Sequence, residues 1–282
     1  MTPPIVPVHS SASSGAVILS TVSADKRPLH HAPVWINAWV ETTERHYALR
    51  SFLSAVFRWT WEVPTPEAGS YCIAYADSTP VLGLGVADDA SGELITYFST
   101  TDVEASLRHA TDLGARVTSP PVTYGVLGTS ALIVDPFGAT LGLWGGGSFA
   151  GFGESYDVNT AGWFDHRSND PEAASAFYQR LTGHDVATVS DDLRVLSADD
   201  RWLAGFSSGD GGRPRWVPIF VVDSLERVRT LVPRLGGAIV LDQRPVADIT
   251  WCAFREPVNG SVITVMVGDE TSPAASGDLY QS

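Results

Sequence analysis

The sequence of 282 residues contains only two cysteines, Cys72 and Cys252, which lie in separate strand-like runs. Two cysteines are too few for the disulfide framework of a small secreted domain, so we expect buried, reduced thiols. Basic residues are also scarce: 18 Lys and Arg stand against 32 Asp and Glu, a formal net charge of −14. Because so acidic a surface repels phosphate groups, we expect neither nucleic acid nor a membrane as partner.

The sequence also lacks any apolar run near the roughly 18 residues that a membrane-spanning helix needs. Its opening, Met1-Thr2-Pro3-Pro4, lacks the positive charge typical of a signal peptide. No P-loop, dinucleotide fingerprint or Gly-x-Ser-x-Gly elbow occurs, so no cofactor is expected. What the chain has is material for a core, with 44% hydrophobic and 18% charged residues. We therefore expect a cytoplasmic globular protein.

Glycine is concentrated near the middle of the chain, in Gly145-Gly146-Gly147 and the residues that follow. A glycine-rich stretch at this place is typical of a linker between domains. The ends of the chain show no sustained hydrophobic period, which is typical of tails. The predicted organisation is an N-terminal tail (1–31), a first domain (32–144), a linker (145–160), a second domain (161–268) and a C-terminal tail (269–282).

The two halves repeat the same pattern, which includes one helix in the later part of each. The first half predicts a helix that opens at Asp102 and ends near Gly114, and the second a helix that opens at Asp223 and ends near Gly236. Each has an Asp as its predicted N-cap and a Gly as its predicted C-cap. An apolar strand precedes each helix.

Turns and first strands repeat as well. The turn at 135–138 corresponds to the turn at 256–260, and the strand at 35–39, with its Trp, corresponds to the strand at 163–167. Each half therefore contains two units of strand, helix and three further strands. Because an internal repeat constrains architecture more firmly than local propensity, we predict an α+β fold of four βαβββ units.

Three local patterns add a family resemblance. The Phe-Tyr-x-x-Leu-x-Gly run at 177–183, the Asp-Pro-x-Gly turn at 135–138 and the Ala-Gly-Phe strand at 204–206 resemble the vicinal oxygen chelate superfamily. That superfamily includes glyoxalase I, extradiol dioxygenases and bleomycin-resistance proteins. The resemblance covers roughly residues 32–268 and is closest to the bacterial tandem type.

The resemblance implies two tandem glyoxalase-like domains, each a mixed sheet curled into a cup, with the cups facing each other. Many relatives reach this arrangement by dimerising shorter chains. A chain that already contains four units is therefore expected as a monomer or a homodimer.

The superfamily typically binds a metal through His, Gln and Glu on first and last strands. Counted from the predicted helix caps, the corresponding positions are Trp35, Ile95, Trp163 and Trp216 on first strands, and Gly142 and Thr264 on last strands. None of these residues can ligate a divalent cation in the expected way. We therefore expect no metal site and do not carry over the metal-dependent activities.

Aromatic residues take the place of the ligands. Because side chains alternate along a strand, residues two positions further share the same face. The ligand-binding candidates on the predicted cup faces are Trp35, Trp39, Trp163, Arg167, Trp216 and Phe220. The catalytic candidates are Asp165, Asn37 and Tyr97. A cavity lined by aromatics with a few polar groups suits a bulky, partly aromatic small molecule.

Each candidate has a plain structural alternative. The tryptophans could fill the core, Asp165 and Arg167 could form a structural ion pair, and Asn37 could be a satisfied core amide.

Two functional hypotheses from different classes remain. The first is a metal-independent enzyme of secondary metabolism that catalyses cyclisation, isomerisation, elimination or hydration of its substrate, with Asp165 as acid or base. The second is a binding protein that confers resistance by sequestering a toxic natural product, as bleomycin-resistance relatives do. Only the first requires the carboxylate of Asp165.

Overall fold

The computed structural model describes residues 29–62, 70–88, 90–152, 157–209, 211–246 and 249–267. Residues 1–28 of the predicted N-terminal tail, 153–156 of the predicted linker and the whole predicted C-terminal tail, 269–282, lie outside the described residues.

The described elements fall into two matching sets. In the first half they are β1 (Pro33–Val40), α1 (Thr43–Phe57), β2 (Thr60–Trp61), β3 (Cys72–Ala76), β4 (Thr79–Val86), β5 (Ile95–Ser99), α2 (Val103–Asp112), β6 (Arg116–Thr123), β7 (Gly128–Val134) and β8 (Thr140–Gly146). In the second half they are β9 (Ala161–Ser168), α3 (Pro171–Thr182), β10 (Asp185–Ser190), β11 (Leu193–Ala198), β12 (Arg201–Ser208), β13 (Arg215–Val222), α4 (Leu225–Arg234), β14 (Ala238–Val246), β15 (Ile249–Arg255) and β16 (Val262–Val267).

Each half forms one eight-stranded mixed sheet, and the two sheets have the same strand order. The first runs β2-β3-β4-β1-β5-β8-β7-β6 and the second β10-β11-β12-β9-β13-β16-β15-β14. Within a unit the first strand pairs in parallel with the last, as β1 does with β4, and the two units join through the antiparallel pair β1–β5. The predicted α+β fold of four βαβββ units is confirmed.

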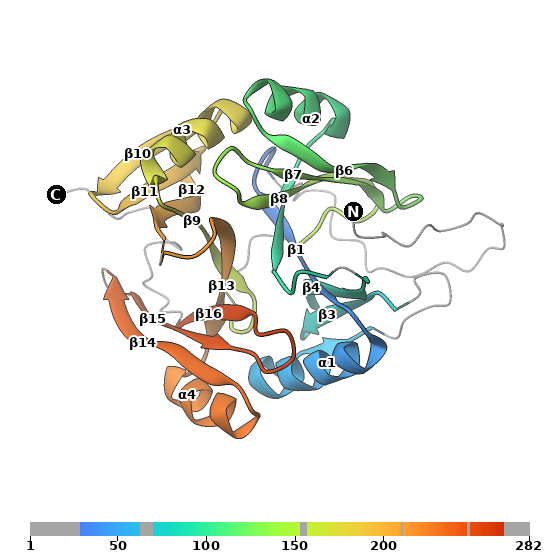
Figure 1. Ribbon diagram of the computed structural model, residues 1–282, viewed down its shortest axis with the longest axis vertical. Helices are drawn as coiled ribbons and strands as arrows, with labels where there is room; N and C mark the ends of the chain where they lie inside the picture. The colour runs from blue at the N-terminus through green and yellow to red at the C-terminus, as the bar shows by residue number, and fades with distance from the viewer. Residues whose placement is uncertain are drawn as a thin grey trace.

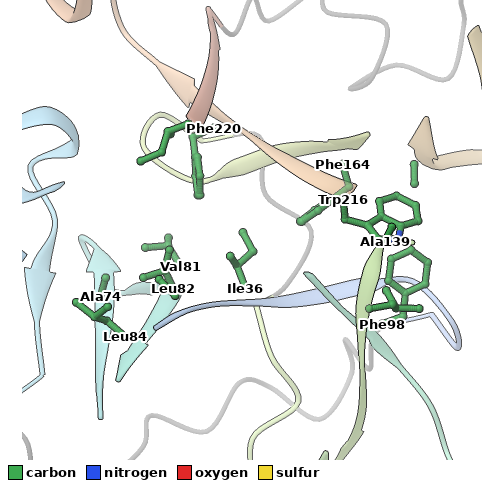
Figure 2. Packing of buried hydrophobic residues seen from close by; sticks show 14 of the residues in the cluster. Ile36, Ala74, Val81, Leu82, Leu84, Phe98, Ala139, Phe164, Trp216 and Phe220 are labelled. Carbon is green, nitrogen blue, oxygen red and sulfur yellow. The ribbon is translucent and has the colours of Figure 1, made fainter. Parts of the chain in front are cut away.

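The main hydrophobic core lies between the two sheets. It unites buried residues of all four helices with one face of each sheet. Phe98 on β5 and Trp216 on β13 have ring centroids 5.0 Å apart, and Phe57 on α1 and Phe220 on β13 are 5.3 Å apart. Figure 2 shows these strands from close by, with Trp216 and Phe220 among the packed side chains. The two halves thus share a single core.

The outward faces of the two sheets carry separate, smaller clusters. One contains only residues of the first half, among them Trp35 and Tyr97, and the other only residues of the second half, among them Ile219 and Met266. In Figure 1, α1 lies beside α4 and α2 beside α3, so the helices join the halves. The expectation that the two cups face each other is therefore wrong: the helix-bearing faces meet, and the cups open away from one another.

The N-cap prediction is correct for α2 and wrong for α4, and both C-caps lie one residue before the predicted glycines, at Leu113 and Leu235. Asp102 caps α2, as its side chain accepts a hydrogen bond from the Ala105 backbone N–H. In the second half the cap of α4 is Ser224, not Asp223, because the Ser224 hydroxyl accepts from the Arg227 N–H at 3.1 Å. The predicted cap of α4 was therefore one residue too early, which shifts every position counted from it.

The segment between the halves is partly built into the first one. β8 continues through Gly146, two residues into the predicted linker. Farther along, Phe149 packs edge-on against Trp35 with ring centroids 4.8 Å apart, and Phe152 lies 5.9 Å from the same ring. These two phenylalanines help to fill the first cup.

A buried polar network crosses the junction between the halves. Asp135, in the turn between β7 and β8, has its Oδ2 atom 2.8 Å from Nε2 of His166 on β9, and the Tyr178 hydroxyl of α3 donates to the same oxygen at 3.0 Å. The Trp216 indole N–H in turn donates to the Tyr178 hydroxyl at 2.8 Å. One carboxylate of the first half therefore organises three buried side chains of the second.

Candidate functional site

The second cup is the outward face of the second sheet, and β9 crosses its centre. Trp163 lies opposite Ile219, and Asp165 lies opposite Val217 on one side and Gly205 on the other. Directly paired residues of neighbouring strands share a face. Trp163, Asp165 and Arg167 therefore point into the second cup, whereas His166 points into the shared core, where it is fully buried.

Asp165 is buried in this cup with only one of its two oxygens paired. The residue is 7% exposed. Its Oδ2 atom accepts hydrogen bonds from Nε of Arg167 at 3.1 Å and from the Ser207 hydroxyl at 2.6 Å. Its Oδ1 atom is buried and has no hydrogen-bond partner among the described residues. An unmatched buried acceptor costs about 1–3 kcal/mol, more if charged, so this oxygen is suited to a partner from outside the chain.

Gly205 lets Asp165 and Trp163 pack closely against β12. A Cβ atom added to Gly205 would lie 3.0 Å from Oδ1 of Asp165 and 3.1 Å from Nε1 of Trp163. The carboxylate oxygen of Asp165 and the indole of Trp163 therefore pack against the backbone of Gly205, where a larger side chain would press on both.

Arg167 is held between an anion and an aromatic ring. Besides its bond to Asp165, its guanidinium carbon lies 5.2 Å from the centroid of the Trp251 ring. Thr264 adds a buried hydroxyl to the second cup, and Val217, Ile219 and Met266 are buried there as an apolar wall. The second cup thus combines an apolar wall with one fixed carboxylate and one fixed cation.

The first cup has the same layout, but its own side chains fill it. Asn37 takes the place of Asp165, and its Oδ1 atom accepts from the Trp35 indole N–H at 2.9 Å and from the Tyr71 hydroxyl at 2.8 Å. Burial raises the pKa of the Tyr97 hydroxyl above its usual value, and a hydrogen bond with Asn37 opposes the shift. At neutral pH Tyr97 therefore stays protonated, and the amide oxygen of Asn37 already has two donors.

Glycines make room for the aromatic rings of the first cup. A Cβ at Gly83 would lie 1.9 Å from the Tyr71 hydroxyl oxygen, and one at Gly142 would lie 2.1 Å from the Tyr97 ring. The half-buried Trp39 covers Gly85 in the same way, since a Cβ at Gly85 would lie 2.3 Å from the Trp39 ring. Of these glycines, the sequence analysis identified Gly142, and only as a position without a metal ligand. Their structural role is to accept rings.

Two predicted site residues do not lie in either cup. Trp216 and Phe220 belong to the shared core, where they are 3% and 1% exposed. The prediction placed them on the cup face because it counted from Asp223, whereas the helix cap is Ser224. The residues of β13 that face the second cup are Val217, Ile219 and Val221.

Two residues of the second cup escaped the sequence analysis. Ser207 lies two positions after Gly205 on β12, so strand alternation from that glycine could have found it. Trp251 lies on β15, the strand before the last, and has no local signal that connects it to Arg167. Its place beside Arg167 follows only from the folding of the whole sheet.

The residues of both cups do not fit the metal of related proteins. The row across the first cup is Trp35, Tyr97 and Gly142, and Thr264 is the last-strand residue of the second cup. Within the described ranges no group of three or more His, Cys, Asp or Glu side chains could hold a metal ion. The Tyr97 ring also occupies the space over Gly142 where a last-strand carboxylate would project.

Solved structures with the same fold come from glyoxalases and extradiol dioxygenases. A Mn(II)-bound glyoxalase from Novosphingobium aromaticivorans aligns with a TM-score of 0.60 at 15% identity, over 84% of this chain and 82% of its own. The 2,3-dioxygenase LapB from Pseudomonas sp. KL28 aligns with a TM-score of 0.59 at 13% identity, over 86% and 94%. At these identities the likeness establishes the fold of the vicinal oxygen chelate superfamily.

The similarity to curated proteins extends beyond the fold to the amino-acid sequence. The chain is 24% identical over 247 residues to the putative glyoxylase CFP32 of Mycobacterium tuberculosis, covering 83% of this chain and 94% of that protein. It is 25% identical over 234 residues to the anthracycline biosynthesis protein DauV of Streptomyces sp. strain C5, covering 74% and 83%. These relatives and the structural neighbours are members of the vicinal oxygen chelate superfamily, so the resemblance predicted from the sequence is confirmed. No protein-family model matches it.

One further finding concerns membranes. Of the helices that the structure describes, none has both the length and the apolar character required to cross a bilayer.

Proposed function

We propose that this protein is a metal-independent enzyme that rearranges a bulky, partly aromatic small molecule in its second cup. The observation that carries the proposal is the buried, unpaired Oδ1 atom of Asp165. The relative DauV, named as an anthracycline biosynthesis protein, supports a substrate class of polycyclic aromatic metabolites. Cyclisation, isomerisation, elimination and hydration all need a positioned proton acceptor, and none of them needs a redox cofactor.

In this proposal Asp165 accepts and returns a proton. Arg167 and Ser207 fix Oδ2, so that the free lone pairs of Oδ1 point toward the ligand. A polar hydrogen of the substrate binds to Oδ1, and its aromatic body lies against Trp163 and the apolar wall. A positioned acid or base of this kind contributes about 10²–10⁴-fold to a rate.

The second cup, rather than the first, is the proposed site. Asn37 is already satisfied by Trp35 and Tyr71, and the linker residues Phe149 and Phe152 pack over Trp35. In this proposal Asn37 and Tyr97, both catalytic candidates from the sequence, serve instead to fill the first cup. Trp35 and Trp39 act with them.

The test uses the full chain and a panel of hydroxylated anthraquinones and anthracyclinones. Products whose mass is unchanged or altered by one water are followed by liquid chromatography and mass spectrometry, and binding is followed by calorimetry. We expect turnover by the natural protein, and in Asp165→Asn a loss of about 100-fold or more with binding retained. Asp192→Asn, an exposed change of the same charge, should behave like the natural protein.

Two outcomes would contradict the proposal in different ways. Tight binding without turnover, unchanged in Asp165→Asn, would replace it with the sequestration hypothesis. Binding that survives in Asp165→Asn but disappears when Asn37 is replaced by Ala would move the site to the first cup.

A further inference from the structure

We infer that Arg167 stabilises an oxyanion that forms on the substrate when Asp165 takes up a proton, so that the substrate is an enolisable carbonyl compound. This role rests on the function proposed above for the second cup and narrows it to removal of a proton from a carbon next to a carbonyl group. The observation that carries it is a mostly buried guanidinium, with donors still unused, directly beside the proposed base.

Arg167 retains most of its hydrogen-bonding capacity. Its side chain is only 11% exposed. Of the five N–H donors of a guanidinium, the one on Nε binds Oδ2 of Asp165 at 3.1 Å. The four donors on Nη1 and Nη2 have no hydrogen-bond partner among the residues that the structure describes. Because a donor largely removed from water costs free energy when it lacks an acceptor, these groups are suited to an acceptor of the ligand.

The guanidinium is held from two sides. Its carbon lies 5.2 Å from the centroid of the Trp251 ring, a cation–π contact. Its Nε edge binds Oδ2 of Asp165, an oxygen that the Ser207 hydroxyl also binds, at 2.6 Å. Arg167 and Asp165 lie two residues apart on β9 and therefore share the face of the second cup. The unused Nη donors and the unpaired Oδ1 atom thus belong to one ion pair.

This ion pair keeps the charge of the site constant during a proton transfer. Before the step, the carboxylate of Asp165 balances Arg167. The C–H bond next to the substrate's carbonyl group then breaks, its proton goes to Oδ1 of Asp165, its electron pair forms a C=C bond, and the π pair of the carbonyl group moves onto oxygen. Asp165 is now neutral, and the negative charge lies on a substrate oxygen that accepts hydrogen bonds from Arg167. Donors fixed in advance where charge develops are usually the largest contribution to catalysis.

The same charges define the substrate class. A ligand that is already an anion would place a second negative charge beside Asp165. A ligand without an acidic proton would leave Oδ1 unpaired, and one without a carbonyl group would leave the Nη donors unmatched. Return of the proton to another atom of the enolate gives isomerisation, and loss of a leaving group next to the enolate gives elimination.

The test measures binding of 4-nitrophenolate, a stable analogue of the enolate, to the full chain by calorimetry. The buffer is alkaline enough that the free compound is the phenolate, which its absorbance shows. Asp165→Asn imitates the neutral Asp165 that follows proton transfer. We expect it to bind 4-nitrophenolate about tenfold or more tightly than the natural protein, because the anion then faces Arg167 without a second negative charge.

Two double variants identify the cation that binds the phenolate. The gain should disappear in Asp165→Asn/Arg167→Gln, which leaves no unpaired buried charge and whose fold is checked by circular dichroism. It should persist in Asp165→Asn/Arg234→Gln, which removes an exposed positive charge on α4. The single variant Asp192→Asn, which removes an exposed negative charge, should show no gain. The neutral 4-nitroanisole should bind no more tightly to Asp165→Asn than to the natural protein.

The contrary results are distinct. Equal or weaker phenolate binding in Asp165→Asn, a gain that persists without Arg167, or an equal gain in Asp192→Asn would each overturn the role of Arg167. Loss of turnover in Asp165→Asn without the phenolate result would support the proposed function and overturn the oxyanion site. Turnover that survives in Asp165→Asn, together with the phenolate result, would support the oxyanion site and overturn the proposed function.

Discussion

At the scale of single residues, the two cups differ at one pair of corresponding positions, where the first cup has the amide of Asn37 and the second has the carboxylate of Asp165. Asn37 and Asp165 are both buried on the first strand of their halves, 8% and 7% exposed. The Oδ1 atom of Asn37 receives two donors from its own cup, whereas the Oδ1 atom of Asp165 receives none from the described residues. The same sheet topology therefore forms one cup that its own side chains fill and one cup with an unpaired acceptor.

Two glycine substitutions, one in each cup, should distinguish the filled first cup from the second cup with its unpaired acceptor. We expect Gly142→Ala to destabilise the fold by about 1–3 kcal/mol, because its methyl group would meet the packed ring of Tyr97 at 2.1 Å. Gly205→Ala should cost less stability, since the end of a side chain at 3.0 Å can shift slightly. It should nevertheless abolish ligand binding in the second cup by covering Oδ1 of Asp165. Urea denaturation and calorimetry measure the two effects, and equal stability losses would contradict the assignment.

At the scale of elements, the sequence predicted the units well because their caps and turns are local signals. Asp102, Gly183 and the turn at 135–138 all act within a few residues of their own position. The error at α4 was also local: Asp223 and Ser224 can both cap a helix, and only the observed bond to the Arg227 N–H distinguishes them. That one-residue shift moved Trp216 and Phe220 to the wrong face of β13.

The site could be predicted less fully, because the side chains that fill a cup come from segments far apart in the sequence. Strand alternation placed Trp163, Asp165 and Arg167 together and His166 apart. It could not show that Tyr71 donates to Asn37, or that Phe149 lies against Trp35, since these contacts join segments far apart in the sequence.

The short segment 29–31, predicted as the end of a tail, should make folding sensitive to acid. Nδ1 of His31 lies 3.1 Å from the Thr182 carbonyl oxygen of α3. Burial, together with smaller effects of His30, His184 and His109, lowers the pKa of His31 from 6.5 to about 4, against the effect of this hydrogen bond. Between these values the unfolded chain binds more protons, so stability is greatest above pH 6.5 and falls as the pH drops toward 4.

We expect His31→Gln to reduce this acid sensitivity. Urea midpoints measured at pH 7.5 and pH 5 should differ less in the variant than in the natural protein. An unchanged difference would show that other groups, such as His46, whose pKa burial also lowers, account for the acid sensitivity.

At the scale of the whole molecule, the shared core and the Asp135 network connect the halves, so we expect them to unfold as one cooperative unit. Oδ1 of Asp135 accepts backbone N–H bonds from Phe137, Gly138 and Ala139 at 2.8–2.9 Å, while Oδ2 serves the second half. We expect Asp135→Ala to destabilise the protein by about 3 kcal/mol or more, because several buried donors lose their acceptor and each unmatched group costs about 1–3 kcal/mol. Tyr178→Phe should cost about 1–3 kcal/mol.

Calorimetric unfolding tests whether this network and the shared core make the two halves unfold together. The natural protein should unfold in a single transition whose calorimetric and van't Hoff enthalpies agree. Two separate transitions in the natural protein would show that the halves are energetically independent despite their common core.

We also expect the folded chain to need no divalent cation. Dialysis against a chelator should leave both the thermal midpoint and ligand binding in the second cup unchanged, since the cup residues offer no suitable set of ligands. Elemental analysis that finds about one zinc, iron or manganese per chain, or a chelator that abolishes binding, would contradict this expectation.

The filling of the first cup has a consequence for stoichiometry. A duplicated fold suggests two equivalent sites per chain and, with them, the opportunity for cooperative saturation. Here Tyr71, Tyr97 and Phe149 occupy one of the two cups, so a ligand of the other cup should saturate at one equivalent per chain along a simple hyperbola. The duplication would then have given this protein a scaffold half and a working half rather than two copies of one activity.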